Sequence, residues 1–316
     1  MRRTGRAVKR KPPIKSPIIV GSTTERTGSA GILRRAVAAI RARFAGLLRE
    51  VLAIFGAVQT LQAEGIERTL YAMTPQQMEA LSAELGRALD RWIASGRDPA
   101  SVFWWSAFVS EAAQTGTAQS VANITRLSPS YAAARSLQQV VYSEPYRNRV
   151  AMAQIKSYEH WTGLSAGVKS ELSQIITRAV ADGKNPRAVR KEIMERLGVS
   201  ERQAYSYAQT DITDTLRQAR WAEKDAAEEE FGLSLGLLWT SALLPMTRPW
   251  HASRNGRVYT TAEVRDFYSR DGNRYRCHCG QTECLLDDAG RPMLSDAAKA
   301  TFRRERENWA RTKKPR

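Results

Sequence analysis

All three cysteines of the 316-residue chain lie in one short stretch, residues 277–284, which reads C-H-C-G-Q-T-E-C. A histidine, His251, stands 26 residues before the first of them. Zinc prefers four tetrahedral thiolate or imidazole ligands, and it can stabilise a small fold that has too few apolar residues for a core. The spacing therefore predicts a structural zinc site made by His251, Cys277, Cys279 and Cys284. His278 is the alternative histidine ligand.

Other chemistries explain these cysteines less well. A disulfide framework would leave one of three cysteines unpaired, and the N-terminus has no secretory signal. A catalytic thiol lacks an identified partner, because the adjacency of His278 and Cys277 in sequence does not place them together in space. A catalytic metal needs an open coordination position, and four protein ligands would leave none. Free thiols without a metal remain the open alternative, and we expect no enzymatic activity.

Four short motifs occur in a fixed order across residues 165–285. They are Ala208-Gln209-Thr210-Asp211, Trp239-Thr240, Thr247-Arg248-Pro249-Trp250-His251 with the turn Asn255-Gly256, and Gly272-Asn273-Arg274-Tyr275-Arg276-Cys277-His278-Cys279. In this order they resemble the phage head morphogenesis family, the minor capsid proteins typified by the F protein of phage Mu. The chain departs from the family pattern in three places. It lacks an Asp after Trp239-Thr240, Asn273 stands four rather than three residues before Cys277, and Cys284 is additional.

The resemblance implies a minor capsid protein of a tailed phage or prophage, without enzymatic activity. Such a protein joins the portal, the scaffold or the major capsid protein during procapsid assembly in the host cytoplasm. It then resides in the virion, inside the head or at the portal vertex, and no small-molecule substrate is expected. One alternative is a metal-dependent nuclease or toxin-type effector, with Glu263, Asp266 or Glu283 as general base. Another is a helix-turn-helix DNA-binding regulator.

The regulator hypothesis depends on three predicted helices with short turns. One helix covers 165–183 and the next begins at Asn185-Pro186 and ends at Gly198. A third begins at Ser200, where Gln203 completes a capping box. Arg202 and Gln203 could contact bases, but acidic residues further along this helix would repel phosphate.

Charge is concentrated at the two ends of the chain. The formal net charge is +17, of which residues 1–15 supply seven and residues 301–316 supply five. Basic tails beside a nearly neutral body suit non-specific contact with DNA, because each neutralised phosphate releases counterions. Solubilising termini are the open alternative. No run of eighteen uncharged apolar residues occurs, so a membrane partner is not expected.

Hydrophobic spacing predicts a mainly α fold with a small α+β C-terminal module stabilised by zinc. Residues 1–28 read as a disordered basic tail, 29–150 as a helical N-terminal domain and 151–235 as a helical central domain. Residues 236–294 form the expected α+β zinc module, and 295–316 a basic helix and tail.

Several features are expected within these domains. An apolar seam from Leu33 to Leu61 predicts one long helix, which packs in the chain's own bundle or against another subunit. Residues 116–130, small and polar, predict a hinge. Arg248, three residues before His251, suits either an anion contact or a surface salt bridge.

Overall fold

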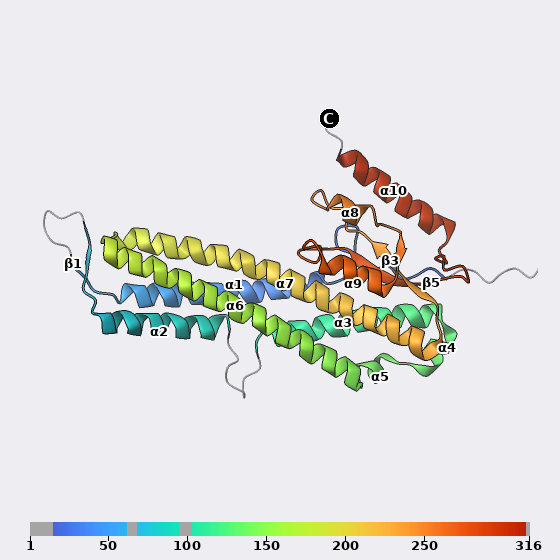
Figure 1. The fold of residues 1–316 in the computed structure, drawn as a ribbon, viewed down its shortest axis with the longest axis horizontal. Helices are drawn as coiled ribbons and strands as arrows, with labels where there is room; N and C mark the ends of the chain where they lie inside the picture. Colours follow the sequence, from blue (N-terminus) through green and yellow to red (C-terminus); the bar gives the residue numbers. More distant parts are fainter. Residues whose placement is uncertain (1–14, 62–67, 95–102, 314–316) are drawn as a thin grey trace, which may run out of the picture.

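The computed structural model describes residues 15–61, 68–94 and 103–313. Figure 1 shows long helices lying side by side and a compact module with strands packed at one end of them. The mainly helical fold with small antiparallel sheets confirms the predicted fold class, apart from the zinc.

The helical part begins with α1 (Ala30–Gly56), the paired strands β1 (Thr60–Leu61) and β2 (Leu70–Tyr71), and α2 (Pro75–Trp92). It continues through α3 (Ser106–Leu127), α4 (Pro129–Ala134), α5 (Leu137–Tyr142), α6 (Glu144–Asp182) and α7 (Pro186–Phe231). The module contains β3 (Leu235–Thr240), α8 (Pro249–Ala252), β4 (Val258–Tyr259), α9 (Thr261–Ser269), β5 (Gly280–Leu285) and α10 (Asp296–Thr312).

The first long helix belongs to the chain's own bundle. Helix α1 contacts α2 and α7, and its buried side chains, including Ile40, Phe44 and Leu47, join the main hydrophobic core. The helix ends at Gly56, earlier than the seam predicted, and Leu61 lies in β1 with 61% of its surface exposed. Local periodicity located the helix correctly and placed its end too late.

The hinge predicted at residues 116–130 is wrong. Helix α3 runs from Ser106 to Leu127 without a break. A Cβ atom added at Gly116 would lie 2.1 Å from the Leu216 carbonyl oxygen of α7. The small residues of this stretch therefore allow two helices to approach closely, and they do not mark flexibility.

Helices α6 and α7 are longer than the sequence pattern predicted. Gly183 ends α6 in a left-handed conformation, and Asn185 caps α7, as expected. The predicted break at 198–200 is wrong, because α7 continues through it and the Ser200 hydroxyl donates to the Arg196 carbonyl one turn earlier. A continuous helix has no turn for a helix-turn-helix reader. The boundary expected at 150/151 also falls inside α6.

The module at the end of the bundle contains a three-stranded antiparallel sheet in the order β4-β3-β5. Strands were expected within this α+β module, and β5 is the one that includes Cys284. Leu237 and Trp239 of β3 face a cluster that includes Cys277 and Cys279. Leu238 faces the opposite side and packs in a separate cluster.

The disordered tail predicted for residues 1–28 is wrong for residues 15–28; the remaining 14 lie outside the described residues. Thr23 accepts a hydrogen bond from Leu243 through its carbonyl oxygen. The amide of Arg26 donates to the His278 carbonyl over 3.0 Å, and its side chain pairs with Glu305. This segment therefore forms part of the module. No helix among the described residues has the length and apolar character needed to cross a bilayer.

Candidate metal centre

Three of the four predicted ligands meet in the interior of the module. His251 lies on the short helix α8, and Cys277 and Cys279 lie in the loop between α9 and β5. The His251 Nδ1 atom is 3.5 Å from Cys277 Sγ and 3.8 Å from Cys279 Sγ. No more than 5% of the surface of any of these residues is exposed.

The fourth predicted ligand, Cys284, does not join them. It lies in β5 opposite Gly236 of β3, and it packs with Leu238, Leu294 and Phe302. Directly paired residues of neighbouring strands share one face of a sheet. Cys284 therefore lies on the face away from His251, and burial raises the pKa of its thiol to about 12. Assigning Cys284 as a ligand is not supported by this geometry.

His278, the alternative histidine, is directed elsewhere. Its Nε2 atom lies 2.6 Å from the Gln209 side-chain amide on α7, and its carbonyl oxygen accepts from Arg26. Burial lowers the pKa of its imidazole. The His278 side chain therefore contacts α7, whereas those of Cys277 and Cys279 pack in the core of the module.

Asn273 orients the His251 ring. The Asn273 Oδ1 atom accepts from the Trp250 indole over 2.7 Å, and its Nδ2 atom donates to the Phe267 carbonyl, which fixes the amide orientation. The same Oδ1 atom lies 3.2 Å from His251 Nε2. Because Oδ1 can only accept, the proton belongs on Nε2, and Nδ1 presents its lone pair to the two sulfurs.

Arg248 supports the same loop. Its guanidinium donates to the carbonyl oxygens of Asn273 and Tyr275, each over 3.2 Å, and it lies 3.4 Å from His251 Nε2. It thus contacts the backbone, where an anion or a surface salt bridge had been expected. Trp250 and Asn273 are further neighbours of the His251 ring.

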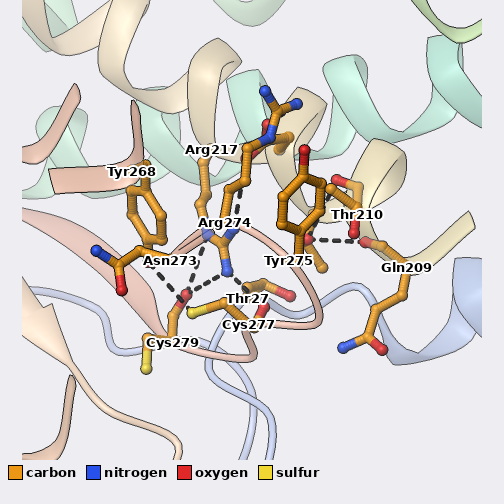
Figure 2. A network of polar contacts seen from close by, with 12 residues as sticks. Thr27, Gln209, Thr210, Arg217, Tyr268, Asn273, Arg274, Tyr275, Cys277 and Cys279 are labelled. Carbon is orange, nitrogen blue, oxygen red and sulfur yellow. Dashed lines mark hydrogen bonds and ion pairs between the residues drawn. The ribbon is translucent and has the colours of Figure 1, made fainter. Parts of the chain in front are cut away.

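Arg217 holds the cysteine loop from the bundle side, and sequence reasoning missed it. Its guanidinium donates to the carbonyls of Cys277 and Cys279, with the Nη2 atom 2.5 Å and 3.0 Å from the two oxygens. The side chain is 1% exposed and lies over the Tyr268 ring. Figure 2 shows Arg217 extending from α7 to this loop. Arg217 lies in an amphipathic helix pattern without a motif of its own, so no sequence signal distinguished it.

The two buried thiols influence each other's pKa in opposite directions. Burial raises the pKa of Cys277, but the hydrogen bond from the Cys279 thiol and the Arg217 charge outweigh burial and hold this pKa well below its usual value. The hydrogen bond to Cys277 and burial raise the pKa of Cys279 well above its usual value. Neighbouring sites of this kind titrate as a pair. A cation between them would displace the remaining proton.

The donor set fits a zinc ion. Zinc–sulfur bonds of about 2.3 Å and zinc–nitrogen bonds of about 2.0 Å at tetrahedral angles separate S and N ligands by roughly 3.5 Å. The observed separations of 3.5 and 3.8 Å agree with this value. Among the described residues, no further His, Cys, Asp or Glu joins the three ligand atoms. Three protein ligands leave the fourth tetrahedral position open, so the expectation that four ligands would exclude a catalytic metal no longer holds. The Tyr268 hydroxyl, 3.5 Å from Cys277 Sγ, is a nearby oxygen.

None of the acids named for a nuclease belongs to the cluster of donors. Glu283 is fully buried and paired with Arg220 over 2.6 Å. Glu263 caps α9, and Asp266 pairs with Arg270 on the same helix. A general base must reach the water or substrate that it activates. Each of these acids already has a partner or a capping role within the described residues, which argues against a free general base here.

Comparison with protein families identifies the class of this region. Residues 170–282 match the family model described as Phage Mu protein F like protein. The match covers the end of α6, all of α7 and the module as far as β5, including the three clustered donors. This part of the chain is therefore phage Mu F-like, which confirms the predicted resemblance to the phage head morphogenesis family. Comparisons with curated proteins and with solved structures found no significant match.

Proposed function

We propose that the chain is a minor capsid protein that joins the portal or the shell during procapsid assembly and remains in the virion. The observation that carries this proposal is the family match over residues 170–282, which coincides with α7 and the module. In this proposal, α7 links the bundle to the module, and the module presents a rigid docking surface. The protein has no enzymatic role.

Assembly of the cognate head tests the proposal. We expect the full chain to co-purify with particles that contain the portal, and deletion of its gene to reduce the yield of filled heads. A matched particle preparation from a strain that lacks the portal should contain little of the chain. Particles that assemble and fill normally without the chain would contradict the assembly role, as would a magnesium- or manganese-dependent nuclease activity of the purified protein.

We also propose that His251, Cys277 and Cys279 hold one structural zinc ion. Their buried donors have the spacing that zinc requires, and the surrounding loop has few aliphatic residues to form a core. Elemental analysis of the purified chain should find about one zinc per chain. Cys279→Ser should lose the metal, whereas the control variant Cys284→Ser should keep it. A metal-free wild-type chain, or equal metal in both variants, would refute this site.

The basic ends are proposed to contact packaged DNA without sequence preference. Arg303, Arg304 and Arg311 are exposed on α10, whereas Phe302 is buried against the module. Charge reversal is therefore a cleaner test than deletion of the helix. Arg303→Glu with Arg304→Glu should lower the affinity for duplex DNA of any sequence and reduce its salt dependence. An unchanged salt dependence would count against contact through this helix.

A further inference from the structure

A cavity of about 490 Å³ lies between α6, α7 and α9, on the bundle side of the module. Its walls carry four cationic side chains. They are Arg149 and Lys156 of α6, Arg265 of α9 and Arg274 of the cysteine loop. None of the three clustered donors lines this cavity, although Tyr268 is shared with the surroundings of the metal centre.

Two of the four cations already have acidic partners. Arg265 pairs with Asp225 over 3.1 Å, and Arg274 pairs with Asp214 over 2.6 Å. Within the described part of the chain, Arg149 and Lys156 make no ion pair or hydrogen bond. Burial lowers the pKa of Arg149, which is half-buried, although the Glu223 charge acts against this effect. The Lys156 charge acts to lower the pKa of Asp214, but the two side chains make no direct ion pair.

Apolar side chains also line the cavity, beside polar ones. Val150, Met152 and Ala153 of α6 face Ala219 and Ala222 of α7 across the cavity. Met152 has 70% of its surface exposed, which places a large apolar side chain at the opening. Ile155, one turn further along α6, is 61% exposed. The site thus combines two cations that lack ion-pair partners among the described residues with apolar side chains in its wall and at its opening.

We propose that this cavity binds an acidic segment of a partner protein, in which Asp or Glu side chains alternate with apolar ones. The carboxylates would pair with Arg149 and Lys156, and the apolar side chains would cover Met152 and the alanines. Charge complementarity favours a peptide over a nucleic acid as the occupant of the cavity. Asp211 and Asp214 line the same cavity and would repel a continuous phosphate backbone, whereas discrete carboxylates can avoid them.

This inference rests on the proposed assembly role in one respect: that role identifies the partner as a head protein. The peptide chemistry follows from the cavity itself. A test with random peptides therefore separates the two proposals. Its failure would remove the peptide site and leave the assembly role to be judged on particles.

The experiment selects a random twelve-residue peptide display library on the immobilised full chain. We expect the wild type to enrich peptides that contain both acidic and apolar residues. Arg149→Glu with Lys156→Glu should weaken the binding of a selected peptide by about 10- to 100-fold, because two charge-assisted contacts are lost. The matched control, Arg147→Glu with Lys169→Glu, reverses two exposed charges of α6 outside the cavity and should bind as the wild type does.

Three results would overturn the proposal. One is a selection without an acidic and apolar consensus. Another is equal binding of the selected peptide by the cavity variant and the control variant, after circular dichroism has shown that both are folded. The third is tighter binding of a twelve-nucleotide single strand that is sensitive to the same cavity variant, which would assign the cavity to nucleic acid. The substitution Met152→Glu, at the rim of the cavity, should also weaken binding of the selected peptide.

Discussion

Arg220→Met should destabilise the protein by about 3–5 kcal/mol, the cost typical of breaking a buried ion pair. Arg220 contacts both carboxylate oxygens of Glu283, over 3.1 and 2.6 Å, and the two side chains are 2% and 0% exposed. Because Asn123 still donates to this carboxylate over 2.9 Å, we expect the lower end of the range. The pair joins α7 of the bundle to β5 of the module, so its loss should affect the junction of the two.

The loss of stability caused by Arg220→Met should depend on pH in a defined direction. Burial alone raises the pKa of Glu283, but Arg220 and the hydrogen bonds of the carboxylate lower it below its usual value. In the wild type, the stability from this group is present above the unfolded pKa and is lost as pH falls through the folded pKa. Without Arg220, burial raises the folded pKa above the unfolded one. The variant then recovers stability as pH falls, and the difference between the two proteins narrows.

Urea unfolding followed by circular dichroism at pH 7.5 and at about pH 4.5 measures this difference. The double variant Arg220→Met, Glu283→Leu should be more stable at pH 7.5 than Arg220→Met alone, because no unpaired charge is buried and Asn123 keeps its bond to the Glu283 carbonyl. Lys191→Met, on the exposed surface of α7, is the control and should leave the midpoint unchanged. A cost under 1 kcal/mol, or a difference independent of pH, would refute the reasoning.

Two further predictions concern packing and the metal centre. Gly116→Ala should destabilise the fold by about 2–3 kcal/mol, since the new Cβ would lie 2.1 Å from the Leu216 carbonyl oxygen. The control Gly167→Ala, where nothing lies within 4 Å of the new Cβ, should raise the thermal midpoint, because alanine favours a helix by up to about 1 kcal/mol. Equal shifts of the thermal midpoint in the two variants would contradict this prediction. Asn273→Ala should lower zinc affinity by about 10- to 100-fold through the orientation of His251, and an unchanged affinity in a chelator competition would remove that role.

Sequence signals that act within a few residues were sufficient to predict much of the fold. Gly183 ends α6 and Asn185 begins α7, as the sequence predicted, and Ser295 caps the basic helix that was expected from residue 295. A cap satisfies backbone groups of its own first turn, so its effect needs no distant partner. The C-x-C spacing was similarly local, and it placed Cys277 and Cys279 close together.

Contacts between distant residues account for the rest. Gly198 did not end a helix and Gly116 did not form a hinge, because packing along α3, α6 and α7 outweighs the helix propensity of a single residue. The unpredicted strand β5 turns Cys284 to the far face of the sheet, away from the other donors. Arg217 lies 60 residues from the carbonyl of Cys277 that it holds. Local composition determines where elements begin, whereas the burial of their faces against one another determines which residues meet.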